Sequence, residues 1–179
     1  MKKQIALAAC LLAAVVLPGC GEVTEPPASS VSAPAETVPA QKEASLTVYL
    51  PDEDGMRVSP REVKVTAGER TLKNALFQMI LLDRKQRYPI LPAGLSVDDV
   101  SVKDGTAVID LSKEIKNLGG GTTTETMFIA MFVNTATEFP NVKQVLFRMD
   151  GKPLTKITGH YDMTQPFKRD ESLIRMERK

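Results

Sequence analysis

Two stretches at the start of the main apolar region alternate between apolar and polar residues. Residues 45–50 (SLTVYL) are rich in β-branched side chains and precede the turn-forming Pro-Asp-Glu-Asp-Gly of residues 51–55. Residues 61–66 (REVKVT) alternate in the same way. Because successive side chains of a strand point to opposite faces, both stretches predict strands, the second with one face toward water.

From residue 71 the apolar spacing changes to three and four residues, which predicts an amphipathic helix. The helix should end near Tyr88-Pro89, because proline interrupts helices. The apolar positions that carry this pattern are Leu72, Ala75, Leu76, Met79 and Ile80.

Residues 100–111 carry the clearest local signal in the chain. Two alternating stretches, 100–103 and 106–111, flank Asp104-Gly105. This dipeptide suits a two-residue type I′ turn, which requires positive φ at both positions. We therefore predict a β-hairpin.

A second helix is predicted after the glycines of residues 119–121, where Thr122 and Glu125 have the spacing of a capping box. Residues 127–133 alone also fit a buried strand, but the helical spacing continues too far for one strand. The positions that sustain it are Phe128, Met131, Phe132, Ala136 and Phe139. Residues 142–149 then alternate into Asp150-Gly151 and predict a last strand.

The predicted order is β-β-α-β-β-α-β, an α+β fold (an α/β sandwich). Two helices with apolar stripes most simply cover one face of a mixed β-sheet. Crossovers that join parallel strands should be right-handed.

The N-terminus has the features of an export signal. Lys2 and Lys3 precede an apolar run over residues 5–16, which is shorter than the roughly 20 residues that a membrane-spanning helix needs. Leu17-Pro18-Gly19-Cys20 resembles a bacterial lipobox, although Pro18 departs from the usual small or branched residue. We expect residues 1–19 to be removed and Cys20 to carry palmitate-type acyl chains, which anchor the chain to a membrane. The alternative is an ordinary signal peptide with Cys20 as a stray thiol.

The composition after Cys20 divides the remaining chain into a tether and a domain. Residues 20–44 are rich in Pro, Ala, Ser and Glu and lack aromatic residues, so we expect a disordered tether. Residues 45–179 suffice for one domain with a hydrophobic core. Loss of Lys2 and Lys3 would reduce the 23 basic side chains to 21, against 22 acidic ones. This balance argues against nucleic acid as a partner.

Four segments together resemble the GerMN domain family: SLTVYLPDEDG (45–55), VSVKDGTAVIDLSKEI (100–115), GGGTTTETMFIAMFVNTATEFPNVKQVLFRMDGK (119–152) and GHYDMTQPFKR (159–169). The resemblance implies an extracytoplasmic domain related to ring-building modules, with a binding or assembly role. It supplies no catalytic residues. Some relatives carry two copies of the domain and this chain carries one, so sporulation does not follow from the resemblance.

Few side chains suggest chemistry. His160, the only histidine, lies two residues from Asp162, and we consider both as contacts for a ligand, although local packing is the simpler interpretation. Asp52-Glu53-Asp54-Gly55 lacks the EF-hand spacing, and residues 119–122 lack the Lys-Ser/Thr ending of a phosphate-binding loop. We expect no metal and no cofactor.

These features favour a non-enzymatic, lipid-anchored binding module on the outside of a membrane, which would be the outer membrane or periplasm if the cell has two membranes. Its partner would be an envelope protein or peptidoglycan. Two alternatives stay open: a peptidoglycan-acting envelope enzyme that uses His160 and Asp162, and a homo-oligomeric assembly module.

Overall fold

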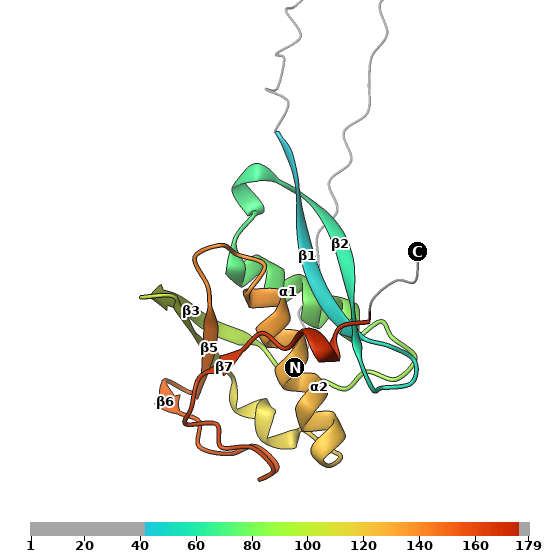
Figure 1. The fold of residues 1–179 in the computed structure, drawn as a ribbon, viewed down its shortest axis with the longest axis vertical. Coiled ribbons are helices and arrows are strands. Elements are labelled where there is room, and N and C mark those ends of the chain that lie inside the picture. Colours follow the sequence, from blue (N-terminus) through green and yellow to red (C-terminus); the bar gives the residue numbers. More distant parts are fainter. Residues whose placement is uncertain (1–41, 176–179) are drawn as a thin grey trace, which may run out of the picture. The chain divides into compact units, whose positions relative to one another are not determined.

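A computed structural model of the chain describes residues 42–175 (Figure 1). The predicted signal peptide, Cys20 and nearly all of the predicted tether lie outside the described residues. Within residues 42–175, no helix combines the length and the apolar character needed to cross a bilayer.

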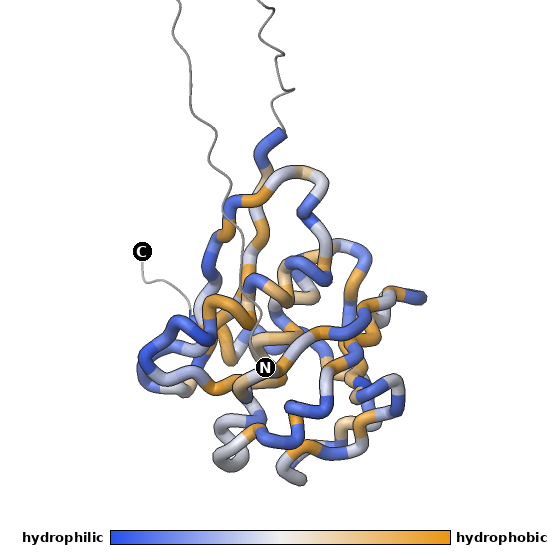
Figure 2. Tube along the Cα trace, turned by 180° about the vertical axis from the view of Figure 1, so that it is seen from behind, coloured by the Kyte–Doolittle hydropathy of each residue, from blue (hydrophilic) through white to orange (hydrophobic). Residues whose placement is uncertain are grey.

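The first two strands form a two-stranded antiparallel sheet of their own. Strand β1 (Glu43–Pro51) pairs with β2 (Val58–Thr66), and Leu46, Val48 and Leu50 are buried. The turn between the strands is hydrophilic (Figure 2). Alternation in the sequence therefore predicted these strands correctly, and both extend beyond the predicted residues.

Helix α1 (Leu72–Asp83) begins where the sequence predicts and ends earlier. Thr71 is the N-cap, and its side chain accepts a hydrogen bond from the backbone N of Asn74. The predicted end near Tyr88-Pro89 is wrong because the Asp83 carboxylate accepts hydrogen bonds from the backbone N–H groups of Ile90 and Leu91, at 3.3 and 3.0 Å. These bonds hold the following loop against the end of the helix.

The second sheet mixes parallel and antiparallel pairs. Strands β3 (Val97–Lys103) and β4 (Thr106–Leu111) form the predicted hairpin, with positive φ at Asp104 and Gly105. Strand β4 then runs parallel to β5 (Gln144–Met149). Two short strands pair antiparallel with β5: β6 (Lys152–Pro153) and β7 (Phe167–Lys168). Short 3-10 helices span Ala67–Glu69, Lys113–Asn117 and Glu171–Leu173.

Helix α2 (Thr122–Ala136) is the centre of the core. It contacts β1 of the first sheet and β5 of the second, and α1 likewise contacts β1 and β3. Because α2 has neighbours on several sides, it is buried almost throughout, as expected for a helix that is apolar all round. Phe128 and Phe132 pack on Phe147 of β5, with ring centroids 5.3 and 5.9 Å away.

The α+β class, the two helices and the mixed sheet are confirmed. The prediction of a single sheet with both helices on one face is wrong in one respect, because β1 and β2 do not join the second sheet. The predicted capping box is also wrong. Gly121 is the N-cap of α2, and the side chain of Glu125 bonds to a distant loop instead.

Candidate functional site

Residues 154–174, hereafter the C-terminal segment, run along α2. In Figure 1 the last part of this segment, in red, crosses α2. It includes β7 and the 3-10 helix Glu171–Leu173. Hydrogen bonds fix the segment to α2 near both ends of the helix, and a cavity lies between these fixed points.

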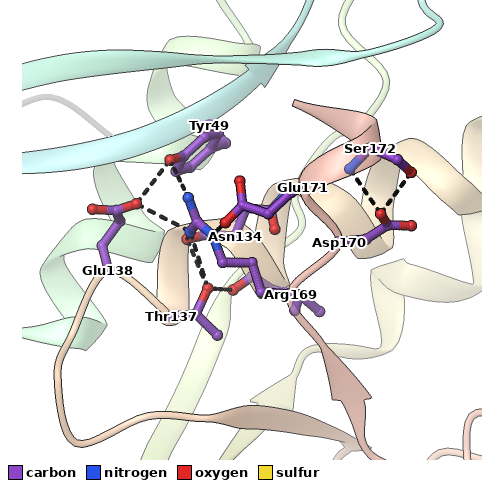
Figure 3. Close-up of polar contacts among 9 residues, drawn as sticks. Tyr49, Asn134, Thr137, Glu138, Arg169, Asp170, Glu171 and Ser172 are labelled. Carbon is purple, nitrogen blue, oxygen red and sulfur yellow. Dashed lines mark hydrogen bonds and ion pairs between the residues drawn. The ribbon is translucent and has the colours of Figure 1, made fainter. Parts of the chain in front are cut away.

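Arg169 makes the contacts at the C-terminal end of α2 (Figure 3). One guanidinium nitrogen donates to the backbone O of Asn134 at 3.1 Å and to Thr137 Oγ1 at 3.2 Å, and it lies 3.0 Å from Glu138 Oε1. The other terminal nitrogen donates to the Tyr49 hydroxyl at 2.7 Å, and that hydroxyl donates to Glu138. Arg169 therefore ties the C-terminal segment to both α2 and β1.

The charges in this network stabilise one another. Burial opposes the charge of Arg169, but hydrogen bonds to Glu171 and Tyr49 outweigh it and raise the pKa of Arg169 above its ordinary value. Burial and the hydrogen bond to Glu138 raise the pKa of Tyr49. Both groups thus keep their usual protonation states over the physiological pH range.

Glu125 makes the contacts near the start of α2. Its side chain is fully buried, and one carboxylate oxygen accepts hydrogen bonds from the Thr158 hydroxyl and from the backbone N–H of His160, the latter at 3.1 Å. Within residues 42–175 its other oxygen has no hydrogen-bond partner. One residue along the helix, the hydroxyls of Thr126 and Tyr161 lie 2.8 Å apart.

Between these contacts lies a cavity of about 130 Å³, the α2 cavity. Thr126, Ala130 and Asn134 of α2 line one wall, and Tyr161, Phe167 and Leu173 of the C-terminal segment line another.

Asn134 is the unusual residue of the α2 cavity. It is only 1% exposed, yet neither its side-chain oxygen nor its side-chain nitrogen has a hydrogen-bond partner within the described part of the chain. Buried polar side chains in native proteins are nearly always hydrogen-bonded. The α2 cavity is the feature of the described domain that most clearly points to a binding site, and Asn134 is a buried, unpaired amide beside it.

The residues singled out from the sequence lie close to this cavity but do not form a catalytic pair. His160 is exposed, and its backbone N–H, not its ring, bonds to Glu125. Asp162 is exposed and accepts hydrogen bonds from the hydroxyl and backbone N–H of Thr164, which hold the pKa of the Asp162 carboxyl below its ordinary value. Among residues 42–175 no hydrogen bond joins the His160 ring to a carboxylate. Cys20 lies outside the described residues.

The predicted surface turn of residues 52–55 also has a local role. Asp52 accepts a hydrogen bond from Ser59, and both Asp52 and Asp54 form ion pairs with Arg175. No group of three or more potential metal ligands occurs in the described ranges. The glycines before α2 have a conformational role, because Gly120 has a φ of +79°, in the left-handed region that favours glycine.

Sequence reasoning missed Asn134, Glu125 and Arg169. A signal existed for Asn134, because a lone amide within the apolar stretch MFIAMFVNTA calls for a partner. Glu125 and Arg169 gave no comparable signal, since their partners lie 33 or more residues away for Glu125 and up to 120 residues away for Arg169.

Comparison with known proteins places this geometry in a family context. The family model Germane, described as "Sporulation and spore germination", matches residues 47–155. The match includes Glu125 and Asn134, whereas His160 and Arg169 follow it.

The spore germination protein GerM of Bacillus subtilis is 28% identical over 187 aligned positions, which cover 84% of this chain and 50% of that protein. The chain thus spans about half the length of this curated relative.

Two solved structures from the same organism share the fold. The first GerMN domain of the sporulation protein GerM aligns at a TM-score of 0.57 with 24% identity, and the alignment covers 72% of this chain and 98% of that domain. The tandem GerMN domains align at 0.55 with 22% identity, covering 70% and 46%. With the family model matching more than half of its residues, the chain belongs to the GerMN (Germane) domain family.

Proposed function

We propose that the chain is a membrane-anchored extracytoplasmic lipoprotein whose GerMN domain acts as a binding module in the cell envelope. The export-type start, with Lys2 and Lys3 before an apolar run, and the lipobox-like residues 17–20 support the anchor. Two or more acyl chains on Cys20 would hold the protein stably, whereas one chain binds only marginally.

The observation that carries the binding role is the α2 cavity, in which apolar side chains lie beside the hydroxyls of Thr126 and Tyr161. Small-molecule sites in proteins are typically concave and mostly apolar with a few polar groups, and the walls of this cavity have that character. A binding role is favoured over catalysis because, among residues 42–175, no hydrogen bond joins the exposed His160 ring to a carboxylate that could orient it.

The proposed partner is peptidoglycan or an envelope protein. Co-sedimentation of the purified protein with isolated peptidoglycan, beside chemical cross-linking in native membranes, separates the two partner classes. Recovery in the peptidoglycan pellet supports the polymer, and a specific cross-linked protein supports the second class. Absence of both results would overturn the binding role.

The anchor has its own test. Mass spectrometry of the native protein should find an acylated Cys20 as the first residue, and Cys20→Ser should release the protein from membranes. An unmodified Cys20 thiol in membrane-derived protein would overturn the lipid anchor and leave the binding role to be judged by co-sedimentation.

A further inference from the structure

We propose that strand β3 pairs edge to edge with β3 of a second copy of the chain, which makes one continuous sheet across two molecules. This inference goes beyond the proposed function and is independent of the α2 cavity and of the lipid anchor. It depends on the free edge of β3, on an apolar side chain exposed there, and on the charges along the strand.

Strand β3 has a free edge, because it is the first strand of the second sheet. In Figure 1 it lies at the margin of the domain. The two-residue turn at Asp104-Gly105 makes Lys103 and Thr106 a hydrogen-bonded pair. Since such pairs alternate along antiparallel strands, the backbone N–H and C=O groups of Val100 and Val102 point away from β4. Within the described domain no other element bonds to these four groups.

Side chains of α1 cover the beginning of the β3 edge and leave its outer half open. Lys73 Nζ donates to the backbone O of Asp98 at 2.6 Å, and Arg84 donates to that of Leu95, just before the strand, at 2.7 Å. The strand also has a bulge between Val97 and Asp99. Covered carbonyls and a bulge both discourage pairing with another chain, so a new strand would add beyond the bulge.

A two-fold axis at Ser101 matches the open half of β3 with itself. Antiparallel pairing about this axis puts Val100 opposite Val102 of the second copy, so the outward backbone groups of the two strands bond to each other. Ser101 then lies opposite its own counterpart. On the same face as Ser101, Asp99 lies opposite Lys103 of the second copy, because side chains directly across a pair share a face.

The side chains suit this register. Val102 is 36% exposed although its neighbour on β4, Ala107, is fully buried, and Val100 of the second copy would cover it. Asp99 and Lys103 are exposed, and among residues 42–175 neither forms an ion pair. Opposite charges directly across an antiparallel pair stabilise it. Since both charges belong to one strand, the match occurs twice in a symmetric pair, which favours a second copy as the partner.

Disulfide trapping of an added cysteine tests the register. In full-length protein with Cys10→Ser and Cys20→Ser no other thiol remains, and Ser101→Cys should then form a disulfide-linked dimer under mild oxidation. The axis puts the two Cα atoms about 4.5 Å apart, within the range of disulfides. Ser96→Cys, at an exposed serine just before β3, is the matched control. Its two positions would lie about 30 Å apart, at about 3.3 Å per residue, and should give at most about a tenth of the dimer.

Charge reversal tests whether the partner is a second copy. In the Ser101→Cys background, Lys103→Asp puts like charges opposite each other twice and should slow trapping about tenfold. Adding Asp99→Lys makes the charges opposite again and should restore the rate. Lys116→Asp, at an exposed lysine outside β3, makes the same change of charge and should leave the rate unaltered. Circular dichroism of each variant shows whether the fold is retained.

Three results would overturn the inference. The first is absence of a trapped dimer, or equal trapping of Ser101→Cys and Ser96→Cys, which would indicate random collision. The second is trapping that Lys103→Asp leaves unchanged or that Asp99→Lys fails to restore. The third is oxidation of cell membranes that links Ser101→Cys to a different protein. Co-sedimentation with peptidoglycan is measured separately, so failure of the pairing leaves the proposed binding function to be judged by that experiment.

Discussion

At the scale of single residues, Arg169 and Asn134 have opposite roles. Arg169 has a polar partner for each of its guanidinium nitrogens, and its contacts join β1, α2 and the C-terminal segment. Asn134, one turn from Thr137, has none for its side chain within the described residues. The first residue stabilises the wall of the α2 cavity, and the second lines the same cavity but keeps a buried, unsatisfied amide.

Replacing Arg169 should destabilise the domain. Arg169→Met keeps most of the aliphatic stem but leaves the Tyr49 hydroxyl without its donor and Glu138 without its ion pair, at a cost of about 1–3 kcal/mol. Urea denaturation measures the change. Arg148→Met, at an exposed arginine of β5, is the control and should stay within about 0.5 kcal/mol of the wild type. Equal effects of the two substitutions would show that the Arg169 network contributes no special stability.

Asp83 should make stability depend on pH in a definite direction. Burial raises the pKa of its carboxyl above 3.8, against the opposing hydrogen bonds from Leu91 and Ile90. Since the folded state then holds its proton more tightly than the unfolded state, this contribution to stability is complete below pH 3.8 and is lost as pH rises through the folded pKa.

Asp83→Asn removes that titration. The free energy of unfolding of the wild type, minus that of the variant, should therefore fall between about pH 3 and pH 7, whatever its absolute value. Urea midpoints of both proteins across this range provide the measurement. A difference that stays constant or rises would contradict the raised pKa.

At the scale of elements, the entry into α2 depends on one of three consecutive glycines. Gly120 has a φ of +79°, and a Cβ there would lie 2.9 Å from Thr124 Cβ, a contact that side-chain rotation does not relieve. Gly119 has an ordinary φ and open space at the same position.

Gly120→Ala should therefore cost about 1–3 kcal/mol, whereas Gly119→Ala should change stability by less than about 0.5 kcal/mol. Thermal unfolding of the two variants beside the wild type measures this. If both alanines prove equally tolerated, the positive φ at Gly120 is not required for the start of the helix.

An element is predicted correctly from the sequence when the residues that determine it lie within it or directly beside it. Asp104-Gly105 specifies a hairpin by itself, and Thr71 marks the start of α1, so both are predicted correctly. The end of α1 is not, because Asp83 bonds to a loop beyond the helix. The capping-box role of Glu125 was assigned wrongly, because Glu125 follows Thr122 at the spacing of that motif although its side chain bonds elsewhere.

The site was the part least accessible from the sequence. The sequence offers His160 and Asp162 as ligand contacts because histidine and carboxylate are the usual chemical groups, with local packing as the simpler interpretation. Both residues lie in the C-terminal segment. The cavity itself arises where that segment crosses α2. No local pattern encodes this crossing, and only the isolated amide of Asn134 among apolar residues hinted at it.

At the scale of the whole molecule, the two sheets share one core. Val48 of β1 and Val145 of β5 are both fully buried, and α2 contacts both strands. The described domain should therefore unfold as one cooperative unit, as small single domains usually do.

Hydrogen exchange measured by mass spectrometry checks this cooperativity. Amides in peptides from the buried half of β1 and from β5 should exchange with the same, global free energy of opening. Markedly faster exchange in β1 would show that the first sheet opens independently of the second.

The isolated bridge between Val58 and Ile174 has a consequence for the order of events during synthesis. It brings a residue from the beginning of the described domain beside one from its end, and Arg175 adds a backbone hydrogen bond to Val58. A polypeptide that emerges amino end first, from a ribosome or a translocation channel, cannot close this seam until almost all of the domain has emerged. Chaperones that bind nascent chains would therefore encounter β1 and β2 as a hairpin before Ile174 and Arg175, which contact Val58, have emerged.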